Sequence, residues 1–397
     1  MKKFQFVVLV VSTSVQAFAF ERLALVDSFD YARSHAIESD AGISRAARYV
    51  AETGSSALLL RNQSGAVPRY RSAEETFPQK APGLDKRRVP WNYPVYGWIR
   101  LDKGETDHFS TFFREAKSCG LKTGVHFTLE ENHYHSFSMG AWNLEHPQYW
   151  CRLQGGAPWS GKASLGYDEV LQHKLRLVEE LLDRGCDYFY LGTERKGAWG
   201  PRWEYTDKMC SEWRGRYGCE PPTDPKDPRW LELVAKYMMR FIREIHRLCH
   251  SSGRNVTFIL GMAQFDCEGD FQLEEVGLDW KAVAAEKSAD ALAISDVNWK
   301  RVSAVADVWA ETERIYRHLK ERSNGLDLYL PFKQYGGDDG GGYPAYAKLL
   351  GVKLEVAAAR QYALAKKCGA RGVILECVDY CNYSPAVCDI MRKDADK

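Results

Sequence analysis

The stretch Tyr188-Phe-Tyr-Leu-Gly-Thr193 decides the fold. This short apolar run follows a long amphipathic segment, residues 169–183, and it ends at the carboxylate Glu194. A helix-period segment followed closely by a buried strand is the repeating unit of α/β proteins with parallel strands. In a (β/α)₈ barrel, polar side chains at the C-terminal ends of the strands surround the mouth, where barrel enzymes keep their active sites. Glu194 is therefore the first candidate catalytic residue.

The same unit repeats along most of the chain. Eight apolar runs of strand length can be counted, over residues 23–29, 57–62, 122–129, 188–193, 256–264, 289–297, 326–333 and 372–378. Helix-period stretches separate them, over residues 43–52, 108–118, 169–183, 231–250, 280–287, 304–322 and 354–367. The order predicts a single TIM barrel, a (β/α)₈ fold of the α/β class, over residues 20–397, since one such barrel with insertions accounts for this length.

Three long insertions follow the second, third and fourth predicted strands, at residues 65–106, 130–165 and 195–229. All three are expected on the C-terminal face of the barrel, and the last two carry Trp142, Trp150, Trp159, Trp199, Trp203 and Trp213. Long loops in a compact domain are usually functional or disordered, and the aromatic content argues against disorder. Flat rings suit stacking on the apolar faces of sugars, whereas packing of the loop itself is the alternative for each ring. We predict that Trp142 and Trp199 line one cleft.

The N-terminus has the pattern of a secretory signal peptide. Lys2 and Lys3 precede a short apolar core, and Ala17-Phe-Ala19 supplies small residues for cleavage. A membrane anchor needs about 20 apolar residues, and the polar segment from Ser12 to Gln16 interrupts the run too early. The sequence predicts removal of residues 1–19, export to the periplasm or the medium, and no stable membrane insertion afterwards.

The charge balance disfavours a polyanionic partner. Removing residues 1–19 takes Lys2 and Lys3 from the 54 basic side chains and none of the 53 acidic ones, which leaves 52 basic residues and a net charge near −1. Binding to nucleic acid depends on a basic surface. We therefore expect no nucleic-acid partner.

The cysteine count predicts some disulfides. Eleven cysteines in an exported chain indicate disulfide bonds with at least one thiol left over. Cys210 with Cys219, and Cys381 with Cys388, are close enough in sequence to form local bridges, although spacing alone does not fix the pairing.

Several carboxylates follow predicted strands. Hydrolysis of a glycosidic bond needs two carboxyl groups, one protonated and one ionised. The catalytic candidates are Glu194, Asp296, Glu376 and Asp266. Glu194 and Glu376 follow the most apolar strands. As partner of Glu194 we rank Asp296, then Glu376, then Asp266. The sixth strand lies nearer the fourth than the eighth does, which favours Asp296, whereas Asp266 could equally cap the segment that follows it. Ion pairs and helix caps are the structural alternatives.

Other polar and aromatic side chains at the strand ends are candidates for substrate binding. These are Arg61, Asn62, His126, Gln264, Trp299 and Lys333, together with Trp142 and Trp199. His126, His133 and His135 are close in sequence, which raises a metal-dependent hydrolase as an alternative. However, His133-Tyr-His135 lies beyond the third strand rather than at its end. We therefore predict no metal and no cofactor.

Three segments resemble known carbohydrate-active proteins. They are Leu58-Leu-Leu-Arg-Asn-Gln-Ser-Gly-Ala-Val-Pro-Arg-Tyr-Arg-Ser72, Phe113-Arg-Glu-Ala-Lys-Ser-Cys-Gly-Leu-Lys-Thr-Gly-Val-His126 and His146-Pro-Gln-Tyr-Trp150. Together they resemble the family-10-like glycosylhydrolases, and the second is similar to the matching unit of family 29 α-L-fucosidases. The resemblance implies a (β/α)₈ barrel that acts on carbohydrate, with an acid at the end of the fourth strand, where Glu194 stands in place of Asp.

These observations predict an exported glycoside hydrolase that cleaves a poly- or oligosaccharide with paired carboxylates at the barrel mouth. The main alternative is a barrel that binds carbohydrate without cleaving it. Two acids facing each other at about 5–10 Å across the mouth would favour the enzyme. Acids each held by an Arg or Lys would favour the binding protein.

Overall fold

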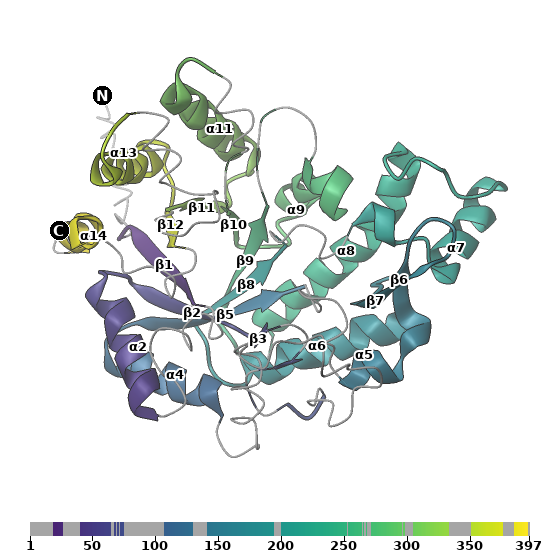
Figure 1. Cartoon of the computed structure of the whole chain (residues 1–397), viewed down its shortest axis with the longest axis horizontal. Coiled ribbons are helices and arrows are strands. Elements are labelled where there is room, and N and C mark those ends of the chain that lie inside the picture. The colour runs from purple at the N-terminus through teal and green to yellow at the C-terminus, as the bar shows by residue number, and fades with distance from the viewer. Residues whose placement is uncertain are drawn as a thin grey trace, which may run out of the picture.

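Eight parallel strands close into a barrel in the cyclic order β1-β2-β5-β8-β9-β10-β11-β12 (Figure 1). The strands are β1 (Glu21–Val26), β2 (Ala57–Arg61), β5 (Lys122–Thr128), β8 (Tyr188–Gly192), β9 (Thr257–Met262), β10 (Ala291–Ile294), β11 (Asp327–Pro331) and β12 (Gly372–Leu375). The computed structural model describes residues 19–26, 40–64, 67–68, 70, 72–74, 107–129, 141–193, 200–251, 253–263, 265, 267, 271–295, 297, 305–332, 351–375 and 385–395. The predicted single (β/α)₈ barrel is confirmed, and each observed strand lies within or close to its predicted range.

Helices surround the barrel. They are α2 (Asp40–Glu52), α4 (His108–Ser118), α6 (Asp168–Leu182), α8 (Pro228–Cys249), α9 (Trp280–Glu286), α11 (Val308–Arg322), α13 (Leu354–Lys367) and α14 (Pro385–Ala395). Side chains of Asp107, Asp279 and Asp307 cap the starts of α4, α9 and α11 by accepting hydrogen bonds from backbone N–H groups of the first turn. Among the described helices, none combines the length and the apolar character needed to cross a membrane.

The strands alternate between an inner and an outer apolar cluster. Along β8, Tyr188 and Tyr190 belong to the small cluster inside the barrel, whereas Phe189 and Leu191 belong to the large cluster between strands and helices. Side chains point to opposite faces of a strand with a period of two. The direction of a side chain near a strand end therefore follows from its register.

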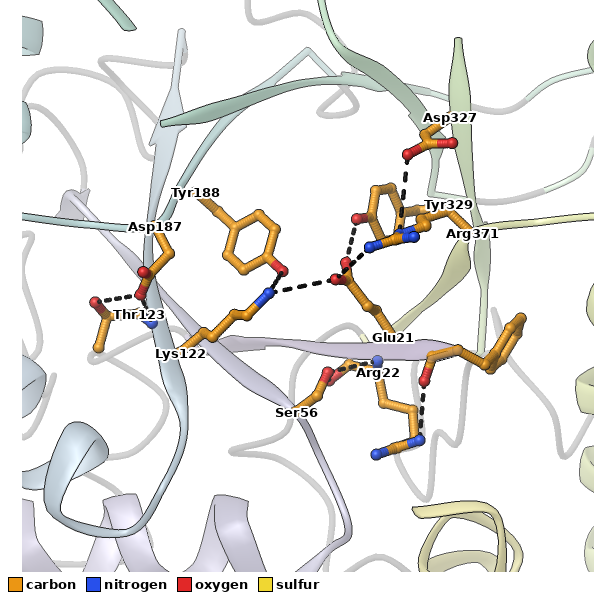
Figure 2. A network of polar contacts seen from close by, with 11 residues as sticks. Glu21, Arg22, Ser56, Lys122, Thr123, Asp187, Tyr188, Asp327, Tyr329 and Arg371 are labelled. Atoms are coloured by element: carbon orange, nitrogen blue, oxygen red, sulfur yellow. Dashed lines mark hydrogen bonds and ion pairs between the residues drawn. The ribbon is translucent and has the colours of Figure 1, made fainter. Parts of the chain in front are cut away.

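A charged network closes the N-terminal end of the barrel, which is the end opposite the mouth. The Glu21 carboxylate accepts hydrogen bonds from the Tyr329 hydroxyl and from Arg371, the latter at 3.1 Å, and Lys122 Nζ lies 3.5 Å away. Lys122 also donates to the Tyr188 hydroxyl at 3.1 Å. Figure 2 shows these side chains converging on Glu21 from four different strands or strand ends. Polar groups thus replace apolar packing at the barrel floor, and each one contacts a partner.

The floor network makes stability depend on pH in the acid range. Burial alone would raise the pKa of the Glu21 carboxyl, but the Tyr329 hydrogen bond and the cations Arg371 and Lys122 outweigh it and hold the pKa below the ordinary 4.5. A lowered folded-state pKa contributes stability that is complete above the unfolded pKa and is lost as the pH falls through the folded value. We expect the difference in unfolding free energy between wild type and Glu21→Gln to be constant from about pH 7 to about pH 5 and to shrink below about pH 4.5. Urea titrations of both proteins at each pH would measure it, and a difference that grows in acid would contradict it.

The second and third insertions contain regular structure where long loops were predicted. The insertion after β5 holds α5 (Ala141–Glu145) and a hairpin of β6 (Trp150–Arg152) with β7 (Pro158–Ala163). The insertion after β8 holds α7 (Asp207–Tyr217). Figure 1 shows α7, β6 and β7 gathered at one side of the barrel. Most of the first insertion, including residues 75–106, lies outside the described residues.

The candidate disulfide between Cys210 and Cys219, a pairing that the sequence left open, is not formed. Both are free thiols, as are all nine cysteines in the described part of the chain, Cys388 included. Cys210 lies in α7, and the helix continues to Tyr217. At 1.5 Å per residue, this places the two Cα atoms on the order of 10 Å apart, beyond the reach of a disulfide. Cys381 lies outside the described residues.

Candidate functional site at the barrel mouth

Three neighbouring strands place polar side chains beneath the mouth. The register pairs Arg61 of β2 with His126 of β5, and His126 with Tyr190 of β8. Arg61 stands two residues after Leu59, which faces the barrel interior, so Arg61 faces the interior as well. The His126 and Tyr190 rings meet edge to face, with centroids 5.0 Å apart. All three residues are buried. The interior is thus polar just below the end where active sites of such barrels lie.

Tyr190 was not singled out in the sequence, and its position depends on a glycine in the next strand. A Cβ atom at Gly261 of β9 would lie 2.3 Å from both Cζ and Oη of the Tyr190 ring. The ring therefore occupies the space that a side chain at residue 261 would need. The register pairs Tyr190 with Ile259, so the ring reaches Gly261 two residues further along β9. The signal in the sequence would have been an inward tyrosine in one strand and a glycine two residues beyond its register partner in the next.

The backbone leading to Glu194 is fixed as far as the preceding residue. Thr193 donates hydrogen bonds to the carbonyl oxygen of Gly261 from its hydroxyl at 2.7 Å and from its N–H at 3.1 Å. Thr193 is fully buried at the end of β8. This residue therefore joins β8 to β9 at the point where the chain continues to Glu194.

Asn62 joins β2 to β5. Its N–H donates to the carbonyl oxygen of His126 at 2.9 Å, and its side-chain oxygen accepts from the N–H of Thr128 at 3.2 Å. The residue is buried at the end of β2. The structure thus shows a role for Asn62 in holding the mouth together, and contact with a substrate stays a prediction.

Trp142 packs within the insertion after β5. Its ring stacks on the ring of His173 in α6, with centroids 4.2 Å apart and planes 5° apart, and on His146 at 4.4 Å. This is the arrangement expected of a ring that packs an insertion onto the barrel. Substrate stacking by Trp142 stays a prediction.

The remaining predicted site residues lie outside the described residues. They are Glu194, Asp296, Glu376, Asp266, Trp199, Gln264, Trp299 and Lys333, as well as His133 and His135 of the metal alternative. The structure describes both chain neighbours of Asp266 and of Asp296. Phe265 and Val297 form an isolated parallel bridge beyond the ends of β9 and β10, and both side chains pack in the outer apolar cluster.

Glu204 is a buried carboxylate that the sequence pattern did not reveal. It is fully buried, accepts a hydrogen bond from Cys151 Sγ at 3.3 Å, and accepts another from the Ser164 hydroxyl. Burial and the neighbouring Glu204 carboxylate raise the pKa of the Cys151 thiol well above its usual value, so Cys151 stays protonated as a donor. Cys151 and Ser164 belong to the insertion after β5, and Glu204 to the insertion after β8. These contacts join the two insertions.

Two tryptophans lie beside this junction. Trp159 of β7 and Trp203 of the 3₁₀ helix η2 (Pro201–Trp203) have ring centroids 4.2 Å apart, and both are partly exposed. The guanidinium of Arg202 lies 4.7 Å from the centre of the Trp203 ring. Partly exposed aromatic surface is therefore present where the two insertions meet.

Comparison with known proteins supports the fold. No family model matches the sequence, and no curated protein matches it. The structure is similar to α-L-fucosidase isoenzyme 2 from Paenibacillus thiaminolyticus, with a TM-score of 0.55 and 13% identity over 95% of this chain and 49% of that one. The chain therefore spans about half the length of the fucosidase.

Two further structures are matched over nearly their whole length. The glycoside hydrolase domain of PgaB (BpsB) from Bordetella bronchiseptica gives a TM-score of 0.57 and 11% identity over 94% of this chain and 99% of that domain. The endo-1,4-beta-mannanase from Rhizomucor miehei gives 0.54 and 12%, over 96% of each chain. At these identities the likeness shows a shared fold, and none of the matches confirms the resemblance to family-10-like enzymes. This chain therefore has the (β/α)₈ barrel that these glycoside hydrolases also have.

Proposed function

We propose that the protein is an exported glycoside hydrolase acting on a poly- or oligosaccharide. The observation that carries the proposal is the buried polar layer of Arg61, His126 and Tyr190 beneath the end of β8, from which the chain continues to Glu194. The three similar barrels described above are glycoside hydrolases by name. Removal of residues 1–19 on export belongs to the same proposal, and N-terminal sequencing of the mature protein would test it.

Strand alternation supports an inward direction for two of the candidate acids. Glu194 stands four residues after Tyr190, and Glu376 two residues after Ile374. Tyr190 and Ile374 both lie in the cluster inside the barrel. If side chains keep alternating between the two faces beyond the end of each strand, both carboxylates point into the mouth.

The bridge between Phe265 and Val297 supports the other two acids. The side chains of Phe265 and Val297 pack outward, so their chain neighbours Asp266 and Asp296 are expected to face the mouth. Strands β9 and β10 follow β8 in the ring, whereas β12 is opposite β8. We therefore keep Asp296 as the first choice of partner for Glu194, ahead of Glu376 and Asp266.

The proposed chemistry needs one protonated and one ionised carboxyl group on opposite sides of the glycosidic bond. The guanidinium of Arg61 would favour the ionised form of a nearby acid, since an opposite charge lowers a carboxyl pKa. His126 would hydrogen-bond a sugar hydroxyl, as would Gln264 and Lys333, while Trp299 would stack. A carboxyl separation of about 5–5.5 Å would mean retention, and about 6.5–9.5 Å inversion.

Activity should be tested on the purified mature chain with a panel of polysaccharides, with products read by chromatography. Release of oligosaccharides from at least one polymer is the expected result. Retention of the protein on an immobilised polymer without any product would instead support the binding alternative, which the aromatic surface at Trp159 and Trp203 also suits.

Replacing Trp199 by alanine should weaken substrate binding by about 1–2 kcal/mol, because stacking on the sugar is lost. We expect a KM higher by about 5–30-fold with little change in kcat, since stacking acts on ground and transition states alike. Steady-state kinetics on a soluble oligosaccharide would measure it.

Trp142→Ala is the informative companion, because Trp142 already stacks on His173 and His146. A raised KM with an unchanged melting temperature would show that Trp142 also binds substrate. A lowered melting temperature with an unchanged KM would assign it to packing. Unchanged kinetics in both variants would remove both rings from the proposed site.

A further inference from the structure

Three potential metal ligands meet at the N-terminal end of the barrel, away from the mouth. His246 lies in the last turn of α8, and His250 is the residue that caps the C-terminus of this helix. Asp290 directly precedes β10. Residues four apart on a helix lie on one face, so both imidazoles face the start of β10. Segments separated by forty residues thus bring three ligand groups together.

The distances suit a shared ion. His250 Nε2 lies 3.1 Å from Oδ1 and 3.0 Å from Oδ2 of Asp290, and His246 Nε2 lies 3.5 Å from Oδ1. One ligand atom of each residue lies within 4.8 Å of the others. Two ligands at about 2.1 Å from a tetrahedral ion are roughly 3.4 Å apart. Small side-chain rotations would therefore bring all three to bonding distance.

The carboxylate is held in place by a neighbouring strand. Asp290 accepts a hydrogen bond from the N–H of Phe258 in β9 at 2.7 Å, and its own N–H donates to the Phe258 carbonyl at 3.0 Å. The His246 ring also contacts the Phe258 ring. Groups that orient metal ligands in this way are a regular part of metal sites.

The three side chains are partly exposed. His246, His250 and Asp290 retain 30%, 38% and 31% of their side-chain exposure. An ion can therefore reach them from solvent, and water can complete its coordination. A structural contribution is expected at this end of a barrel, because the bottom face serves stability rather than catalysis.

We propose that His246, His250 and Asp290 bind one divalent transition-metal ion, with Zn²⁺ as the best match, and that this ion fastens the end of α8 to β9 and β10. Two imidazoles and one carboxylate form a typical zinc ligand set, whereas Mg²⁺ and Ca²⁺ prefer oxygen ligands alone. This site is independent of the proposed hydrolase activity. The sequence predicted no metal. This site was missed because Asp290 lies 40 residues from His250 in the sequence.

The test uses the mature chain without a histidine tag, stripped with EDTA and dialysed. Isothermal titration with ZnCl₂ should show one ion bound per chain, and the loaded protein should unfold at a higher temperature, because the ion binds the folded state. His246→Ala and Asp290→Asn should each weaken binding by at least about tenfold. The asparagine keeps an oxygen to accept from Phe258. Circular dichroism in EDTA should show both variants folded.

His318→Ala is the matched control. His318 lies on α11, is similarly exposed, and its ring contacts Phe265 much as His246 contacts Phe258. Its binding isotherm should match wild type. The Co²⁺-substituted protein should show no thiolate charge-transfer band, because the neighbouring Cys249 is buried and is not among the ligands. Absence of saturable binding, or equal affinity in wild type and His246→Ala, would overturn the proposal and leave only hydrogen bonding between His250 and Asp290.

Discussion

Glu194→Gln should reduce turnover by several orders of magnitude while oligosaccharide binding persists. The amide keeps the size and most hydrogen bonds of the acid but removes its charge and its titratable proton. Neither a nucleophile nor a general acid or base remains at residue 194, whereas stacking and hydroxyl contacts are untouched. Kinetics, oligosaccharide affinity and melting temperature should be measured on one preparation. Glu286→Gln is the control, since Glu286 pairs with Arg243 on the outer helices and should leave turnover unchanged.

The same experiment separates catalysis from an ion pair. If Glu194 neutralises a buried cation, its replacement strands that cation and lowers the melting temperature. The specific activity of the folded fraction would then stay near normal. That result would contradict the assignment of Glu194 and move the catalytic proposal to Asp296 with Glu376.

Glu21→Ala should lower the free energy of unfolding by about 3 kcal/mol, because it removes the buried carboxylate at the centre of the barrel floor. Arg371 loses the carboxylate partner at 3.1 Å and keeps the more distant Asp327 at 3.9 Å, while the buried Tyr329 hydroxyl loses its acceptor. Burial and the adjacent Glu21 raise the pKa of Tyr329, so this phenol stays neutral and needs an acceptor. Urea denaturation followed by tryptophan fluorescence would measure the loss.

Lys122→Ala is the control for this prediction. The Lys122 side chain is 57% exposed and 3.5 Å from Glu21, so its removal should cost less than about 1 kcal/mol. Specific activity should be unchanged in both variants, because the floor lies at the opposite end of the barrel from the mouth. Equal losses of stability would show that Glu21 acts through packing rather than through charge.

The barrel was predictable because its strands and helices bury apolar side chains in patterns that are visible in the sequence: short continuous apolar runs for the strands and one apolar face for the helices. The run from Tyr188 to Gly192 is apolar along its whole length, as expected of a strand buried on both faces, and the helix before it is amphipathic. The hairpin of β6 and β7 was missed because its strands are short and their pairing is irregular. Helix α7 was missed because polar side chains dominate it and only Met209 and Trp213 are buried.

At the candidate site, sequence position identified residues but not their contacts. Arg61 and His126 do meet beneath the mouth, since strand ends converge in any barrel. The role of Tyr190 depends on the space above Gly261 in another strand, which no local pattern encodes. The candidate bridge from Cys210 to Cys219 does not form, because spacing in the sequence does not account for the rise of the helix between the two cysteines.

The contacts of Glu204 limit how the two insertions can be exchanged in engineered barrels. Loop grafting on barrel enzymes treats each insertion as an exchangeable part, but here the carboxylate of one insertion is satisfied by Cys151 and Ser164 of the other. Transplanting either insertion alone would separate Glu204 from the donors Cys151 and Ser164, at a cost of several kcal/mol. A chimera that exchanges these insertions must therefore carry the insertion after β5 and the insertion after β8 together.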